Sequence, residues 1–125
     1  MTGVTKVDLE HFNLEITNDW QVSTREKKPG PPERLDGLTI GYVESDRSAP
    51  HGGEVHPNGD EMLLVISGQL EVACDSAPGD PLIVKPGEAC IVPKGEWHKV
   101  NVVGQTRFIH ITPGPDGDHR PLKDK

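Results

Sequence analysis

Cysteine is scarce in this 125-residue chain, with only Cys74 and Cys90 present. Each lies within a strand-like apolar run, so the pattern favours buried free thiols over a disulfide. A cysteine-based zinc site would need more thiols or a Cys-x-x-Cys spacing, and the sequence has neither. The scarcity therefore argues against a disulfide and excludes a thiolate metal site.

Long hydrophobic runs and clusters of positive charge are also missing. The longest apolar stretch, Met62 to Ile66, is far too short to cross a bilayer, and the N-terminus lacks the pattern of a signal peptide. We therefore expect a cytoplasmic protein with no membrane partner. The net charge is −7 and no basic stripe with interleaved aromatics occurs, which argues against a nucleic-acid partner.

Glycine and proline are abundant, with 14 and 12 residues, and they recur as punctuation between short apolar runs. This pattern predicts many short strands joined by turns and no convincing helix. The expected strands lie near 38–44, 53–56, 61–66, 69–74, 81–85, 89–92, 97–103 and 107–112. The fold class is thus all-β, and the strand number favours an antiparallel, jelly-roll-like barrel.

The organisation expected is a single domain with two weakly patterned ends. Residues 1–37 form an N-terminal extension, in which 7–16 could be a strand or a short helix and 23–36 a charged, proline-rich exposed loop. Residues 38–112 form the barrel. The tail 113–125 is rich in Pro, Gly and Asp, and we expect it to fray. His11 and His119 lie in these ends and receive no role.

Ionisable residues gather around two turns of the predicted barrel. Glu54 and His56 are two apart on one strand, so they share a face, and Glu61 begins the returning strand. His98 arrives from a separate strand after the Pro93-Lys94-Gly95 turn. Two imidazoles with one or two carboxylates form a ligand set that suits Fe(II), Mn(II), Ni(II) or Zn(II). The sequence therefore predicts a divalent-metal site.

Two runs of this sequence carry a resemblance to a known family. The first contains Glu54, His56, Glu61 and Gly68. The second contains Gly87, Pro93, Gly95, His98 and Asn101. In order and spacing they resemble the two motifs of the cupin superfamily. That resemblance implies a small single-domain cupin with a double-stranded β-helix (jelly-roll) fold, often dimeric, that binds one metal through His56, Glu61 and His98.

The chain departs from the cupin motifs at two points. The first motif usually begins His-x-His, and here Glu54 stands in the first position. The second motif usually has three residues between its His and Asn, whereas two separate His98 from Asn101. The first departure bears directly on the identity of the metal and its coordination.

Glu54 has three interpretations. As a fourth ligand it would complete a shell of two imidazoles and two carboxylates. As a free carboxylate beside a triad of His56, Glu61 and His98, it could act as a general base. The third alternative is an exposed glutamate at a strand end.

A pocket beside this site would be mostly aliphatic. The expected wall residues are Tyr42, Leu63, Val65, Val72 and Val100. His51 lies just before the site, and it could be a flexible loop residue, a replacement ligand or a proton shuttle. His110 shares a strand face with Phe108 and Thr112, pointing either into the pocket or into the core. Such a lining suits a small, partly apolar ligand or substrate.

Three functions fit these features. The first is a metal-dependent enzyme, a dioxygenase, isomerase or lyase, acting on a small organic acid, diketone or sugar-derived substrate. The second is a non-catalytic cupin that binds or senses a small ligand, and the third is a metal-free, lectin-like or structural jelly roll. An exposed sheet face bearing Met62, Leu64 and Ile66 makes a homodimer plausible.

Overall fold

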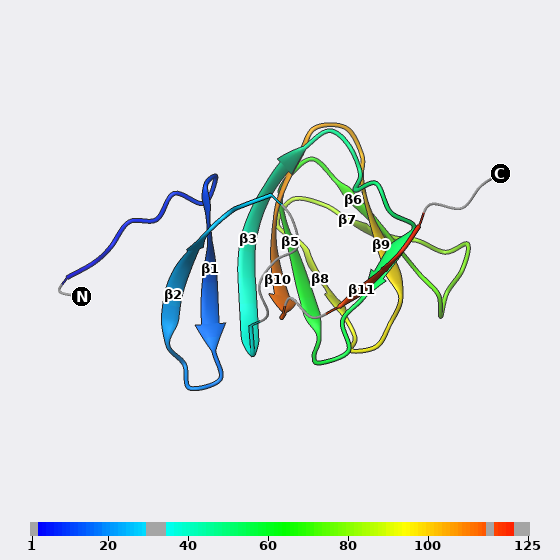
Figure 1. The fold of residues 1–125 in the computed structure, drawn as a ribbon. Coiled ribbons are helices and arrows are strands. Elements are labelled where there is room, and N and C mark those ends of the chain that lie inside the picture. The colour runs from blue at the N-terminus through cyan, green and yellow to red at the C-terminus, as the bar shows by residue number, and fades with distance from the viewer. Residues whose placement is uncertain (1–2, 30–34, 115–116, 122–125) are drawn as a thin grey trace.

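The computed structural model describes residues 3–29, 35–114 and 117–121, which form strands and no helix (Figure 1). The strands are β1 (Phe12–Thr17), β2 (Val22–Glu26), β3 (Gly37–Ser45), β4 (Gly53–Val55), β5 (Glu61–Ser67), β6 (Leu70–Cys74), β7 (Leu82–Val84), β8 (Ala89–Val92), β9 (His98–Val102), β10 (Thr106–Pro113) and β11 (Asp118–Arg120). The all-β prediction is confirmed. No helix that could span a membrane occurs in the described ranges.

Two antiparallel sheets make up the molecule. One has the strand order β2-β1-β3-β10-β5-β8, and the other has the order β11-β4-β9-β6-β7. Consecutive strands therefore cross between the sheets, as they do from β4 to β5 and from β9 to β10, which is the jelly-roll arrangement. These crossings bring residues from both sheets to one end of the space between them.

Strand β5 shows why the two sheets face each other. Glu61, Leu63 and Val65 are buried, while Met62, Leu64 and Ile66 alternate with them on the exposed face. The inward aliphatic residues join a core drawn from both sheets. That core consists of Leu63, Val65, Leu70, Val72, Val84, Cys90, Val92 and Phe108. Both cysteines are free thiols, as predicted, but only Cys90 is buried, whereas Cys74 is partly exposed.

Gly68 makes the tight turn from β5 to β6, so the chain passes directly from one sheet to the other. Its φ is +79°, and a Cβ there would lie 2.5 Å from the Gln105 carbonyl oxygen and 2.5 Å from Thr106 Oγ1. Any other residue would be strained and would collide with the neighbouring turn. This glycine thus holds the register of β5, on which the burial of Glu61 depends.

The predicted jelly-roll barrel consists of two sheets packed face to face. The hydrogen-bonded ladders end at β8 in one sheet and at β7 in the other, and no ladder joins the two sheets among the described residues. Strand β7 has three residues and β8 has four. Because these strands are so short, side-chain packing rather than a continuous ladder holds the layers together.

Both chain ends contribute strands that sequence reasoning assigned to irregular structure. Strand β2 begins one residue before the predicted exposed loop 23–36 and includes the first four residues of that loop. It pairs with β1, which in turn pairs with β3. The side chains of β2 are mostly exposed, so its sequence lacks the alternation of apolar residues by which a strand is predicted. Of the rest of that loop, residues 30–34 lie outside the described residues. Similarly, β11 pairs with β4 in the tail that we expected to fray.

Candidate metal centre

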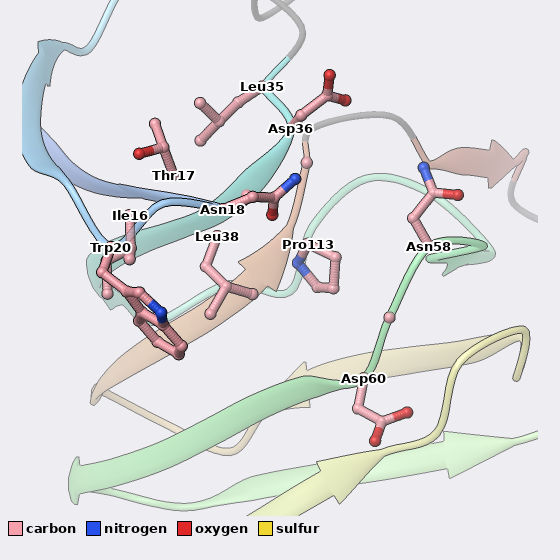
Figure 2. Close-up of a pocket in the computed structure, with 13 residues that line it drawn as sticks. Ile16, Thr17, Asn18, Trp20, Leu35, Asp36, Leu38, Asn58, Asp60 and Pro113 are labelled. Atoms are coloured by element: carbon pink, nitrogen blue, oxygen red, sulfur yellow. The ribbon is translucent and has the colours of Figure 1, made fainter.

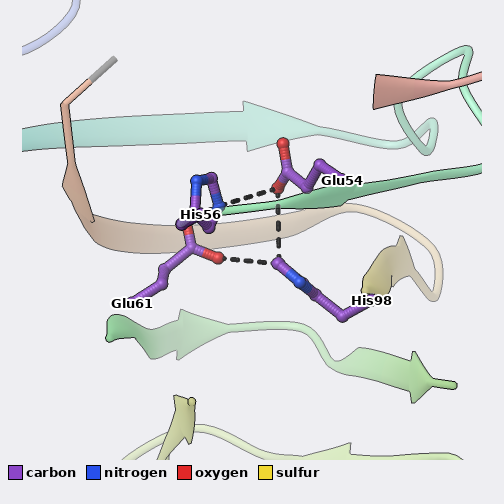
Figure 3. Close-up of side chains that lie close together, drawn as sticks. All are labelled: Glu54, His56, Glu61 and His98. Atoms are coloured by element: carbon purple, nitrogen blue, oxygen red, sulfur yellow. Dashed lines mark hydrogen bonds and ion pairs between the residues drawn. The ribbon is translucent and has the colours of Figure 1, made fainter. Parts of the chain in front are cut away.

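Four side chains from both sheets meet at one end of the interior (Figure 3). Glu54 lies on β4 directly opposite His98 on β9, so their side chains project from the same face of one sheet. His56 follows β4 by one residue, after which the turn at 57–60 leads to Glu61 at the start of β5 in the other sheet. Sequence reasoning named all four residues, and the structure brings them together.

The ligand atoms of this group, called here the His/Glu cluster (Glu54, His56, Glu61 and His98), all lie within 4.8 Å of one another. His98 Nε2 is 3.0 Å from Glu61 Oε1 and 3.5 Å from Glu54 Oε1. His56 Nε2 is 3.3 Å from Glu61 Oε2 and 3.8 Å from Glu54 Oε1. A single cation at the centre of these atoms would have two nitrogens and two carboxylates within reach.

The His98 ring is fixed in the orientation that a metal ligand needs. Its Nδ1–H donates to the Glu96 carbonyl oxygen at 3.0 Å, because that carbonyl can only accept. In the neutral ring, the lone pair of Nε2 therefore faces the carboxylates of Glu54 and Glu61. A lone pair facing two carboxylates is repulsive unless a proton or a metal cation lies between them.

His56 provides the sharpest indication that a cation fits. Its Nε2 is buried and makes no hydrogen bond, although two carboxylates lie within ion-pair distance. Buried polar atoms without a partner are rare and call for an explanation. An ion coordinated by His56 Nε2, His98 Nε2 and the facing carboxylates would satisfy this atom. The donor set is one that binds divalent metals, so the cluster is able to hold one.

The ionisation of the cluster follows from mutual pairing in a buried place. Burial alone would raise the pKa of Glu61, but its pairing with His56 and His98 lowers it to about 2. Burial would lower the histidine pKa values, but the two carboxylates raise that of His56 to about 9 and that of His98 to about 10. The two histidines likewise lower the pKa of Glu54, against the effect of its burial.

A short relay from β10 supports Glu61. The Thr112 hydroxyl donates to Glu61 Oε2 at 2.6 Å, so its oxygen is left to accept from Nδ1–H of His110 at 2.8 Å. His110 packs closely on Gly41, because a Cβ at position 41 would lie only 2.2 Å from Nε2 of His110. Burial lowers the pKa of His110, which keeps it neutral and suited to this donation. Sequence reasoning gave Thr112 no role, although its spacing from His110 on one strand face was the available signal.

Comparison with known proteins identifies the family. A family model for the cupin domain matches residues 42–112, more than half of the chain. The chain belongs to the cupin family. No curated protein matches it.

Solved structures share the fold of this cupin. A double-stranded β-helix protein from Klebsiella pneumoniae has a TM-score of 0.55 at 19% identity, covering 76% of this chain and 90% of that one. A protein from Ralstonia eutropha, provisionally named a mannose-6-phosphate isomerase, has a TM-score of 0.53 at 23% identity, covering 67% and 87%. At these identities the likeness shows the fold alone.

A longer protein also resembles this cupin over part of its length. The provisionally named ethanolamine utilization protein Q from Salmonella typhimurium has a TM-score of 0.48 at 23% identity, and the alignment covers 61% of this chain. It covers 57% of that protein, so this cupin spans less than two thirds of its length.

The His/Glu cluster of this cupin borders a cavity of about 1080 Å³. Its wall includes Glu54, His56 and Glu61 together with aliphatic and aromatic side chains. Of the predicted pocket residues, His51, Leu63, Val100 and His110 line this cavity. Tyr42 does not, because it alternates with Val43, which does, and so lies on the outer face of the sheet. The predicted wall residues Val65 and Val72 lie in the buried core instead.

A second cavity, of about 450 Å³, lies between the β1–β2 turn, the start of β3 and the turn at 58–60 (Figure 2). Trp20 lines it with 84% of its surface exposed and a φ of +67°. None of the four cluster residues borders this cavity.

The charge pairing makes the stability of the metal-free protein depend on pH. In the unfolded chain His56 and His98 have a pKa near 6.5. Between pH 6.5 and about pH 9 to 10 the native state therefore binds more protons than the unfolded state. The stabilisation that the two protonated histidines give the native state is therefore lost as the pH rises through that range. The carboxylate contribution is lost at the other extreme, as the pH falls below 4.5, the usual pKa of a glutamate, toward about 2.

We therefore expect urea unfolding of metal-free protein to show a free energy of unfolding lower by more than about 1 kcal/mol at about pH 9 than at about pH 5.5. His98→Ala should make the same comparison flatter, since one of the two raised pKa values is removed. Equal or greater stability at the higher pH would contradict this account of the cluster.

Proposed function

We propose that this cupin binds one divalent metal ion through His56, Glu61, His98 and Glu54. The observation that carries the proposal is the convergence of four ligand atoms within 4.8 Å, three of them from buried residues, with a buried imidazole nitrogen that makes no hydrogen bond. Imidazole and carboxylate together favour Fe(II), Mn(II), Ni(II) or Zn(II) over soft-ligand metals.

We propose further that the metal-bearing protein is an enzyme acting on a small oxygenated organic substrate. A bound divalent cation would supply Lewis acidity toward substrate oxygens and, if redox-active, a means of activating dioxygen. Leu63, Val100 and Phe108 in the cavity wall beside the cluster would contact the apolar parts of such a substrate. Dioxygenase and isomerase or lyase chemistry both fit this arrangement.

Glu54 is the cluster residue best placed to exchange protons with a substrate. Its side chain is 21% exposed, compared with 4% for Glu61 and none for His98. It also lines the cavity directly. A carboxylate in that position can accept a proton from a substrate carbon or oxygen that lies in the cavity.

Turnover can be tested without knowing the substrate in advance. Metal-reconstituted protein is offered panels of 2-oxo acids, β-diketones and sugar acids, with oxygen uptake measured by electrode and solvent deuterium exchange by proton NMR. Oxygen consumption indicates a dioxygenase, and exchange without it indicates an isomerase or lyase. His98→Ala is the control. Binding of panel members without turnover would favour the non-catalytic small-ligand-binding alternative.

Removal of either histidine should weaken metal binding. We expect His56→Ala and His98→Ala each to lower affinity by at least about 10- to 100-fold, the range seen even for loss of an outer-shell partner. Competition titration with a chromophoric chelator measures this, on protein prepared without a polyhistidine tag. The exposed His11 supplies the matched control, because His11→Ala leaves the cluster intact. Unchanged affinity in both cluster variants would refute the proposed metal centre.

Replacing Glu54 separates its two roles. Glu54→Gln keeps the shape of the side chain and removes its charge, so we expect metal affinity to fall by at least about 10-fold if Glu54 is a ligand. The same chelator competition measures it. Wild-type affinity combined with lost turnover would instead mark Glu54 as a base that does not coordinate.

We also propose that two copies of the chain associate through the outer face of β5 and β8. Met62 and Ile91 are cross-strand partners there and are 37% and 69% exposed, with Leu64 and Ile66 beside them on the same face. These outward residues carry no charge, whereas the whole chain has a net charge of −7. Two acidic copies could therefore associate through this contiguous apolar patch without bringing their negative charges together at the contact.

Sedimentation equilibrium of the wild-type protein should give twice the chain mass of 13.6 kDa. Ile91→Lys should shift it to the monomer, because a charge would be buried at the contact. Leu82→Lys, at an exposed apolar residue of the other sheet, should leave the dimer intact. A monomeric wild-type protein, or equal effects of both variants, would contradict this interface.

A further inference from the structure

Glu54 presents its two carboxylate oxygens to two different groups of histidines. Oε1 faces the Nε2 atoms of His98 and His56, at 3.5 and 3.8 Å. Oε2 lies 3.4 Å from Nε2 of His119, on the opposite side. The rings of His119 and His51 are themselves in contact, with centroids 4.8 Å apart. Glu54 is thus shared between the His/Glu cluster and a second group of side chains.

We propose that His51, His119 and Oε2 of Glu54 form a second divalent-metal site, bridged to the first by the Glu54 carboxylate. One ligand atom from each of these three residues lies within 4.8 Å of the other two. Two imidazoles and one carboxylate oxygen suit Zn(II), Co(II) or Ni(II). The proposal rests on the proposed metal centre only through the shared Glu54.

The sheet itself places His119 beside Glu54. His119 on β11 and His98 on β9 are the cross-strand partners of Glu54 on its two sides. Residues directly opposite one another project from the same face, so the three side chains form one row across β11, β4 and β9. All three are therefore presented to the same side of the sheet by regular backbone pairing.

Strand β11 is held in place by its last residue. The Arg120 guanidinium makes two hydrogen bonds of 2.9 Å to the carboxylate of Asp75, and it lies 4.5 Å from the centre of the Trp97 ring. Gly117, just before β11, comes so close to β4 that a Cβ there would lie 2.3 Å from the Val55 carbonyl oxygen. The strand that carries His119 is thus fixed before any ion binds.

The loop that carries His51 is held against the same strand. The Gly52 N–H donates to the Arg120 carbonyl oxygen at 2.7 Å. The Lys99 ammonium donates to the carbonyl oxygens of Ala49 and His51. These bonds fix the backbone on both sides of His51, whose side chain lines the same cavity as Glu54 and His119.

The second site should be the weaker of the two. His119 is 61% exposed, whereas His98 is fully buried, and the carboxylate is shared with the first ion. The Gly53 N–H also donates to Nδ1 of His51 at 3.2 Å, so the neutral ring carries its proton on Nε2. Coordination through Nε2 moves that proton to Nδ1 and sacrifices the hydrogen bond. The two sites are therefore expected to fill in sequence.

Isothermal titration of tag-free, metal-free protein with ZnCl2 tests the proposal. We expect two equivalents per chain in the wild type, the second at least about 10-fold weaker. His119→Ala and His51→Ala should each abolish the weaker equivalent and keep the tighter one, which also shows that both variants fold. The matched control is His11→Ala, which removes the exposed group of Asp8, Glu10 and His11 and should retain both equivalents.

A pair of glutamate variants isolates the bridge. Glu54→Gln should weaken both equivalents, whereas Glu61→Gln should weaken only the tighter one, because Glu61 faces the first site alone. Equal effects of these two variants on the weaker equivalent would count against a bridging Glu54.

Other outcomes separate this site from the proposed metal centre. A single equivalent in the wild type, lost in His98→Ala, would overturn the second site and leave the first standing. A second equivalent lost in His11→Ala but kept in His119→Ala would also overturn it. Conversely, a weaker equivalent that persists in His98→Ala and disappears in His119→Ala would support the second site independently of the first.

Discussion

The rest of this structure depends on the meeting of two imidazole nitrogens with two carboxylates in a buried position between two sheets. Ionised carboxylates are expensive to bury unless cations compensate for them, and here the compensation comes from protons on His56 and His98 or from a metal ion. Protons and metal therefore compete for the same nitrogens. The facing carboxylates accordingly raise the pKa values of His56 and His98, to about 9 and about 10.

The fold provides the rigidity on which that attraction depends. Glu61 begins a strand whose Leu63 and Val65 are anchored in the core, so its side chain cannot turn outward without a register shift that would expose both. Thr112 holds its second oxygen, and the Glu96 carbonyl fixes the ring of His98. The cluster is thus preorganised by neighbours that would not themselves touch a bound ion.

The strand period was enough to predict the four cluster residues and the inward face of β5, because alternation relates sequence directly to side-chain direction. The strand period did not predict β2 and β11, because these strands are held by backbone pairing and by ion pairs such as that of Arg120 with Asp75. Such edge strands carry no apolar alternation. His119 was missed for the same reason, since its place beside Glu54 comes from a pairing between segments more than sixty residues apart.

Glu54 stands where the first cupin motif usually has a histidine, and this difference changes more than the hardness of one ligand. A neutral imidazole with one nitrogen toward a metal keeps its proton on the other, whereas a carboxylate offers two equivalent oxygens that can face different cations. In this chain the strands on both sides of Glu54 present a histidine to it. A carboxylate with imidazoles on both sides can connect two metal ions, whereas a neutral histidine at the same position could coordinate only one.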